Sequence, residues 1–152
     1  MTGRTRLLIG LCLLPLAAVG AWLLLREPKS PREQIAETIL SLERAVEAQD
    51  VAGCIRLFSP DYRDSQGITR AVLRRLATEG LRDAQSIDIT AYEPEITFTE
   101  SGATARVEAI VTAVTSRGRQ EWPLTVTFTL QRERRRWRIV AAEDWQHLMA
   151  EW

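Results

Sequence analysis

The chain has 152 residues, and its 20 lysines and arginines balance 20 aspartates and glutamates, so its formal net charge at pH 7 is zero. A neutral chain with interspersed charges has no bulk field that attracts nucleic acid, and we expect no nucleic-acid partner. Two cysteines and one histidine are too few for a disulfide framework or for the usual ligands of a metal site, so neither a metal nor a cofactor is expected.

The chain begins with an apolar segment. No charged residue occurs from Leu7 to Leu25, and a helix of that length crosses the ~30 Å hydrocarbon layer of a bilayer. We therefore expect a single-pass, uncleaved signal anchor that makes the membrane a partner of the chain. Two alternatives stay open: a signal peptide cleaved near Ala21, and a lipoprotein signal ending at Cys12, which the preceding Leu11 disfavours.

An anchor of this kind divides the chain at its linker. Residues 1–29 form the tail, the anchor and a short linker, and residues 30–152 are the right length for one domain. Basic residues flank the apolar segment on both sides, so the positive-inside rule does not decide the orientation. We expect the domain on the outer, periplasmic or extracytoplasmic, side because so short an N-terminal tail is usually retained.

Three helices are predicted after the linker. Ser30-Pro31-Arg32-Glu33 is typical of a helix start, with a serine cap, proline in the first turn and a glutamate that completes a capping box. An apolar stripe follows on one face of this helix, made by Ile35, Ile39, Leu42 and Val46. This face requires a covering sheet or helix.

The next two helices are shorter. Asp50 is placed to cap a helix from Val51 to Phe58, which Ser59-Pro60 ends because the residue before proline disfavours helical torsions. A third helix is predicted from Thr69 to Glu79, stopping at Gly80. Its buried side chains are predicted to be Val72, Leu73 and Leu76.

From Ser86 onward the apolar period changes from the helical repeat to two, which indicates strands. Turns at Ser101-Gly102, Arg117-Gly118 and Glu133 to Arg135 separate successive strands, so an antiparallel meander is expected. The apolar faces of the strands are Ile87, Ile89 and Ala91; Ile96 and Phe98; Ala105, Val107, Ala109, Val111 and Ala113; Trp122, Leu124, Val126, Phe128 and Leu130; and Trp137, Ile139 and Ala141.

The predicted fold class is α+β: an N-terminal transmembrane helix, then three helices packed on the concave face of a curved antiparallel sheet. The resulting cone-like barrel usually holds a pocket. We expect Phe58, Tyr62, Val107, Phe128, Trp137 and Ile139 to line it.

The chain from about Ser30 to Trp145 resembles the nuclear transport factor 2-like superfamily. The resemblance rests on Ala48-Gln49-Asp50-Val51-Ala52 at a helix junction, on Leu57-Phe58-Ser59-Pro60-Asp61-Tyr62 after it, and on Trp137-Arg138-Ile139 in the last strand. The superfamily includes ketosteroid isomerases, SnoaL-like cyclases, dehydratases and non-catalytic binding or assembly modules. The resemblance also implies dimerisation through the sheet, with plain solvent exposure of the threonine face of the fourth strand as the alternative.

Isomerase-like members of that superfamily use a pocket carboxylate as a proton shuttle, with a tyrosine or a protonated acid as oxyanion donor. The weak candidates here are Glu143, Asp61 and Tyr62. Glu143 continues the inward register of the last strand, although the sheet has ended before it in the alternative reading. We therefore favour no catalytic residue.

A run of arginines follows the fourth strand: Arg132, Arg134, Arg135, Arg136 and Arg138, with Arg117 and Arg119 on the preceding turn. Such a run contacts anionic lipid headgroups or phosphate in some proteins and is a solvated turn in most. The sequence leaves both readings open.

The sequence favours a membrane-anchored, non-catalytic binding or assembly module whose ligand is a small apolar molecule or whose partner is another protein. The alternative is an isomerase, cyclase or dehydratase-like enzyme that acts on a small apolar substrate.

Overall fold

The computed structural model describes residues 28–145. Three helices, α2 (Pro31–Glu47), α3 (Val51–Arg56) and α4 (Arg70–Asp83), precede the strands β1 (Ala84–Ala91), β2 (Glu95–Phe98), β3 (Ala103–Thr115), β4 (Gly118–Glu133) and β5 (Arg136–Glu143). The chain divides into two compact units, Met1–Ser30 and Pro31–Trp152. All of these helices and strands belong to the second unit.

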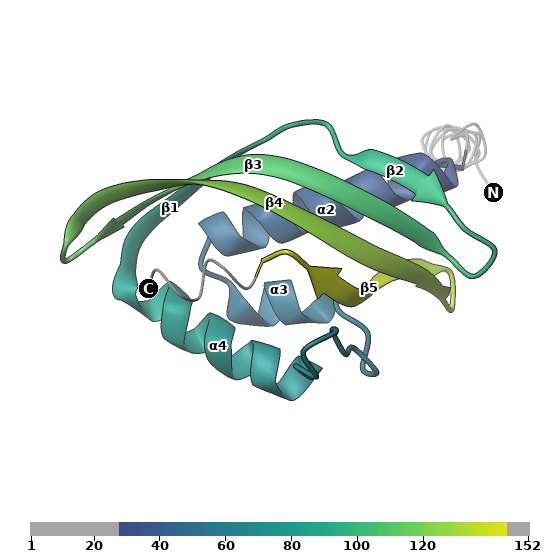
Figure 1. Ribbon diagram of the computed structural model, residues 1–152, viewed down its shortest axis with the longest axis horizontal. Helices are drawn as coiled ribbons and strands as arrows, with labels where there is room; N and C mark the ends of the chain where they lie inside the picture. The colour runs from purple at the N-terminus through teal and green to yellow at the C-terminus, as the bar shows by residue number, and fades with distance from the viewer. Residues whose placement is uncertain (1–27, 146–152) are drawn as a thin grey trace, which may run out of the picture. The chain divides into compact units, whose positions relative to one another are not determined.

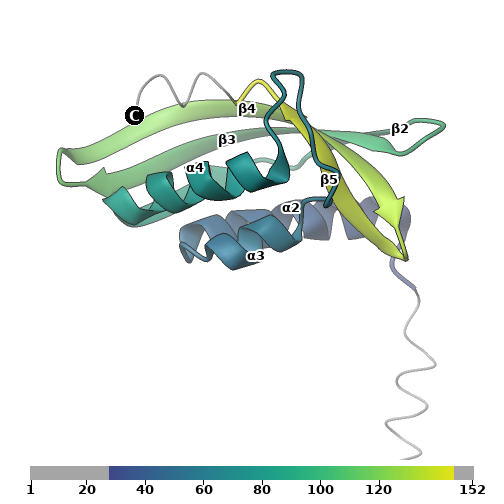
Figure 2. The same ribbon diagram turned by 90° about the horizontal axis from the view of Figure 1, so that it is seen from below.

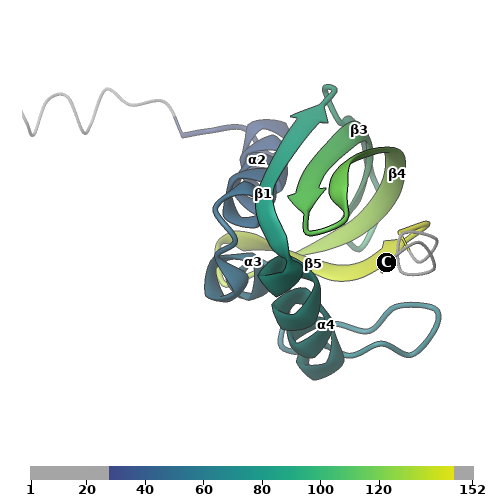
Figure 3. The same ribbon diagram turned by 90° about the vertical axis from the view of Figure 1, so that its left-hand side faces the viewer.

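The strands form one antiparallel sheet in the order β1-β3-β4-β5, with β2 paired to β3 beyond β1. The long strands β3 and β4 bend along their length, and the helices lie on one side of the sheet (Figure 1, Figure 2). Seen from the end, the sheet curls around the space beside the helices (Figure 3). The predicted α+β architecture, three helices on the concave face of a curved antiparallel sheet, is therefore confirmed.

The inner face of the sheet follows the predicted alternation. Ala105, Val107 and Ala109 are buried on β3, and Val126 and Phe128 are buried on β4. Side chains between them on each strand point to the opposite face, because successive residues of a strand alternate sides. The main core also includes Ile35 and Ile39 from α2, so the apolar stripe of that helix is covered by the sheet.

The short helix α3 begins where the sequence predicts and ends two residues earlier. Asp50 caps it, since the Asp50 carboxylate accepts a hydrogen bond of 2.8 Å from the Gly53 amide. The predicted end at Phe58 is wrong because Phe58 forms a parallel bridge with Ile139 of β5 instead. The segment after α3 thereby covers part of the edge of β5.

Helix α4 extends past Gly80, where the sequence predicts its end, and continues to Asp83. The side-chain amide of Gln49 donates hydrogen bonds to the carbonyls of Leu81 and Ala84, at 2.8 and 2.6 Å. These bonds satisfy carbonyl groups that a helix end leaves without intrahelical partners. The contact with Gln49 thus stabilises the last turn of α4, although Gly80 inside the helix destabilises it.

The predicted transmembrane helix is corrected. Within residues 28–145 no helix combines the length and the apolar character needed to cross a membrane. The longest described helix, α2, has 17 residues, which at 1.5 Å per residue is shorter than the ~30 Å hydrocarbon layer, and it carries charges on its surface. The described residues therefore form the α+β cone without a spanning helix, which corrects the predicted fold class and the predicted single-pass localisation with an outer domain. The segment from Leu7 to Leu25 lies outside the described residues.

Candidate functional site

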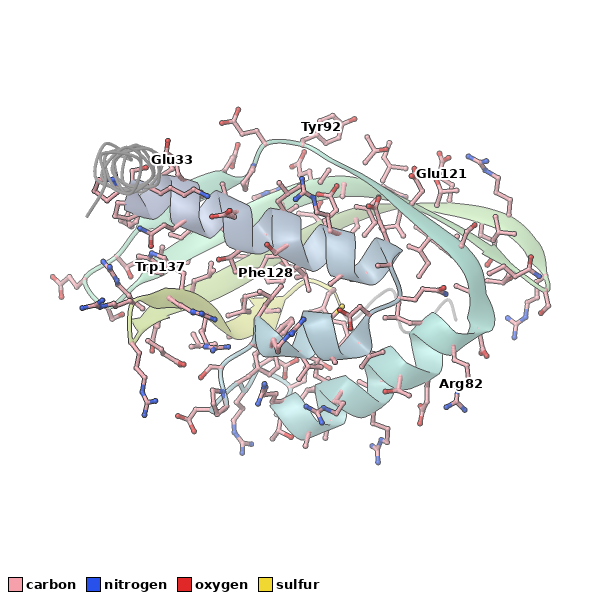
Figure 4. The ribbon with its side chains drawn as sticks, turned by 180° about the vertical axis from the view of Figure 1, so that it is seen from behind. Glu33, Arg82, Tyr92, Glu121, Phe128 and Trp137 are labelled. Atoms are coloured by element: carbon pink, nitrogen blue, oxygen red, sulfur yellow. The ribbon has the colours of Figure 1, made fainter. Side chains whose placement is uncertain are left out.

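A cavity of about 510 Å³ lies between the inner face of the sheet and the three helices. Its walls are almost entirely apolar, and every helix and most strands contribute to them. The side chains that make most of the wall are Ile39, Leu42 and Val46 of α2, Leu73, Leu76 and Leu81 of α4, and Val107, Ala109, Leu124 and Phe128 of the sheet. Figure 4 shows Phe128 in the interior of the molecule, whereas Tyr92 points outward.

Helix α4 covers the open side of this cavity without being fully packed. Its apolar side chains, predicted to be buried, are only half-buried: Val72, Leu73 and Leu76 all keep exposed area, and no residue of α4 is fully buried. Leu73 and Leu76 line the cavity instead of packing against a second layer of side chains, which explains their partial exposure. The cavity therefore exists because α4 spans the concave face without filling it.

Tyr62 lines the cavity, and its hydroxyl is buried. The side chain is 2% exposed, and its ring packs edge-on against Phe58 with ring centroids 5.1 Å apart. The hydroxyl makes no hydrogen bond of normal geometry with any residue in the range 28–145. Burial, and then the charge of Asp64, raise the pKa of Tyr62 well above its usual value. Polar interactions with the backbone of Ala142 and the side chain of Trp145 partly offset this increase. Tyr62 is therefore a protonated hydrogen-bond donor at neutral pH.

Asp64 shapes the loop that carries Tyr62. One oxygen of its carboxylate accepts hydrogen bonds from the amides of Gln66 and Ile68, at 3.0 and 2.8 Å. Its other oxygen is buried without a hydrogen-bond partner among the described residues. A buried carboxylate that holds backbone amides is a loop-forming group, so we assign Asp64 a structural role.

Glu43 is the carboxylate of α2 that lines the cavity, and the sequence analysis did not single it out. Burial raises the pKa of Glu43 most, the carboxylates of Glu47 and Asp88 raise it further, and Arg44 opposes them. The sequence does contain a signal for Glu43: it lies four residues after Ile39 and three before Val46, and residues at these spacings share one face of a helix. Glu79 and Asp83 of α4 also lie on the cavity wall.

Of the six residues predicted to line the pocket, four line the cavity and two lie elsewhere. Phe58, Tyr62, Val107 and Phe128 line the cavity. Ile139 is fully buried in the core beside it. Trp137 lines a separate groove and packs against Phe98, with ring centroids 6.3 Å apart.

Glu143 lies on the surface because of a β-bulge. Ile139 pairs with Leu130 and Ala141 with Thr129, so Val140 between them has no partner on β4. One extra residue reverses the side on which the following side chains lie. Ala142 therefore points into the core at 4% exposure, and Glu143 is exposed opposite Thr127.

Asp61 is also exposed, and its backbone amide donates to the Ser59 hydroxyl at 3.1 Å. Of the three weak catalytic candidates, only Tyr62 thus reaches the cavity. In the described part of the chain, no three histidine, cysteine, aspartate or glutamate residues are close enough together to hold a metal ion.

Comparison with known proteins shows what the cone is similar to. The family model of the SnoaL-like domain matches residues 35–143. No curated protein matches the chain significantly in sequence.

Solved structures with the same architecture are distant in sequence. A nuclear transport factor 2-like superfamily protein from Salmonella enterica is 17% identical, with a TM-score of 0.65 over 74% of this chain and 87% of that one. A candidate dehydratase of the NTF2-like family from Streptomyces avermitilis is 12% identical, with a TM-score of 0.64 over 76% and 95%. A protein of unknown function from Mycobacterium tuberculosis is 19% identical, with a TM-score of 0.61 over 72% and 67%.

At these identities the solved structures show the fold alone, and the family match covers most of the domain. The chain belongs to the SnoaL-like domain family and has the cone fold of the nuclear transport factor 2-like superfamily.

Proposed function

We propose that the chain is a non-catalytic binding protein that takes up a small apolar molecule in the cavity between α4 and the sheet. The observation that carries this proposal is the cavity itself, an apolar space of about 510 Å³ whose lining includes Tyr62. Ligand sites of proteins are typically apolar clefts of about 300–1,000 Å³ with a few placed polar groups.

The Tyr62 hydroxyl supplies the polar contact of such a ligand. A buried donor without a partner carries a desolvation cost of about 1–3 kcal/mol, which a ligand carbonyl or hydroxyl would relieve. The preferred ligand is therefore an apolar molecule with one hydrogen-bond acceptor. A pure hydrocarbon of the same shape would leave the hydroxyl unpaired and bind less well.

Filling the cavity tests this proposal. We expect Ala109→Phe to abolish binding of the neutral fluorescent dye Nile red, because Ala109 is 5% exposed and lines the cavity. Thr125→Phe is the matched control, since it adds the same side chain to the outer face of β4. Urea unfolding of both variants establishes that they fold. Equal dye binding by a folded Ala109→Phe variant and the wild type would refute the proposal.

A pair of nearly isosteric ligands tests the role of Tyr62. We expect Tyr62→Phe to weaken binding of 2-acetylnaphthalene about fivefold to tenfold, corresponding to one hydrogen bond of about 1 kcal/mol, and to leave 2-ethylnaphthalene unchanged. Isothermal titration calorimetry gives both affinities. Equal weakening of both ligands would assign Tyr62 to packing alone.

Glu43 favours a second candidate function, proton transfer in an isomerase or dehydratase-like enzyme. The Streptomyces avermitilis relative is named as a candidate dehydratase. A carboxyl group with a raised pKa on an apolar wall is suited to general acid–base catalysis. In that role Glu43 would move the proton while Tyr62 donates a hydrogen bond to the substrate oxygen.

Exchange of the methyl protons of 2-acetylnaphthalene in D₂O, followed by NMR, distinguishes the two functions. A binding protein leaves the exchange rate at its solution value. An enzyme accelerates it, and Glu43→Gln removes the acceleration while Glu108→Gln, at an exposed outer position, retains it.

A further inference from the structure

A second hollow lies on the other side of α2 from the apolar cavity. It is an open groove of about 800 Å³ between α2, α3 and the start of β5. Helix α2 separates the two: Ile39 and Leu42 face the cavity, whereas Thr38 and Ser41 face the groove. We call it the arginine groove because Arg44, Arg56, Arg135, Arg136 and Arg138 line it.

The groove concentrates positive charge on a chain that has none overall. Five arginines line it against two acidic residues, Glu37 and Asp50, although the whole chain is neutral. The arginines come from α2, α3, the β4–β5 turn and the start of β5, so tertiary structure brings them together. Field lines in a concave surface lined by one sign of charge are focused, which favours an oppositely charged ligand.

Two of the five arginines, Arg138 and Arg56, interact with neighbouring residues of the groove. The guanidinium of Arg138 donates a hydrogen bond to the Arg56 carbonyl and lies 3.7 Å from the Glu133 carboxylate. Glu133 in turn accepts a hydrogen bond of 2.5 Å from the Ser59 hydroxyl. Arg138 thus joins β5 to the end of α3 and positions the groove wall. Arg56 lies 3.8 Å from Asp50 in an exposed pair.

Arg135 and Arg136 have no such role. Both side chains are exposed, and neither forms an ion pair with any residue between 28 and 145. They stand at the turn between β4 and β5, where they border the groove. These two charges are available to a ligand.

The backbone of this turn is strained. Arg134 and Arg135 are its two central residues, and their φ angles are +51° and +92°. Two-residue hairpin turns that need positive φ at both positions strongly prefer Asn-Gly, because non-glycine residues at positive φ are unfavourable. Residues held in such conformations destabilise the fold and cluster at functional sites. Arg134 and Arg135 therefore occupy positions at which asparagine and glycine would give a more stable turn.

We propose that the arginine groove binds a small ligand that carries at least two phosphate charges. Guanidinium groups are suited to this chemistry because their planar donors match phosphate oxygens in bidentate geometry. The recessed site, the two uncommitted arginines and the strained turn that presents them all favour such a ligand. The site is separate from the apolar cavity, so either proposal can fail without the other.

Binding of inorganic pyrophosphate to the full chain tests this inference. We expect Arg135→Ala with Arg136→Ala to weaken binding at least tenfold, measured by isothermal titration calorimetry. Arg117→Ala with Arg119→Ala is the matched control, because it removes two arginines from the β3–β4 hairpin, and it should change the affinity less than twofold. Equal losses in both double variants, or no binding by the wild type, would overturn the proposal.

A turn variant separates function from stability. Arg134→Asn with Arg135→Gly supplies the preferred turn residues, so we expect a higher Tm together with weaker pyrophosphate binding. Nile red binding should be unchanged, which reports an intact cavity. A variant with unchanged pyrophosphate affinity would show that the turn arginines do not contact the ligand and would contradict the inference.

Vesicle flotation identifies the source of the phosphate. The arms are phosphatidylcholine vesicles with and without phosphatidylinositol 4-phosphate, each with the wild type and the Arg135→Ala, Arg136→Ala variant. Phosphoinositide-dependent flotation that the variant loses and pyrophosphate competes assigns the site to a lipid headgroup. Equal flotation of both proteins, with pyrophosphate binding retained by the wild type, assigns it to a soluble phosphate compound.

Discussion

At the scale of single residues, burial raises the pKa of two side chains in the core, Cys54 and Tyr62. Cys54 is 4% exposed, and burial together with the charge of Asp50 raises the pKa of its thiol from 9.0 to about 11. Burial raises the pKa of Tyr62 as well. Both groups are neutral in the folded protein at physiological pH, and both ionise more readily when the chain unfolds.

Alkaline pH should therefore destabilise the fold through Cys54. As pH rises through 9.0, the unfolded thiol loses its proton first, so the stability contribution present below pH 9 is lost progressively up to about pH 11. We expect the free energy of unfolding in urea to fall over this interval, and to fall less in Cys54→Ala. Parallel pH profiles of the two proteins would contradict the raised pKa of the thiol.

At the scale of elements, local sequence signals determine where the helices begin, whereas contacts between elements determine where α3 and α4 end. Asp50 caps α3, as the sequence predicts, and Thr69, predicted as the first residue of the third helix, is the N-cap of α4. The end of α4 depends on Gln49, and the end of α3 depends on the pairing of Phe58 with Ile139. The bulge at Val140 gives no local signal, yet it decides that Glu143 is exposed.

Two glycines should respond oppositely to alanine. A Cβ at Gly102, in the β2–β3 turn, would overlap the Leu130 carbonyl, so Gly102→Ala should destabilise the fold by about 1–3 kcal/mol. A Cβ at Gly80 meets no atom within 4 Å, so Gly80→Ala should stabilise α4 by about 0.5–1 kcal/mol. Urea unfolding measures both. Stabilisation by Gly102→Ala would mean that the turn relaxes more freely than the structure indicates.

At the scale of the whole molecule, the hydrophobic core formed by the described residues lies inside the second compact unit. Its buried residues extend from Ile35 to Ala142, with Trp145 packed against them. A domain with its own hydrophobic core can in principle fold by itself.

A fragment from Ser30 to Trp152 should therefore unfold cooperatively, with a Tm within about 4 °C of the full chain, since 1 kcal/mol shifts Tm by about that amount in a domain of this size. Thermal melts followed by circular dichroism give both values. A non-cooperative melt of the fragment would show that residues before Ser30 contribute to the core.

The sequence by itself determined the order of helices and strands, the α+β class and the inward face of most strands. These follow from periodicity and capping, which act over a few neighbouring residues. Tertiary structure alone decided that α4 leaves a cavity, that Glu43 reaches it while Glu143 does not, and that five arginines share one groove. The reason is physical: cavities, bulges and charge clusters arise from residues distant in sequence, whose juxtaposition no local pattern encodes.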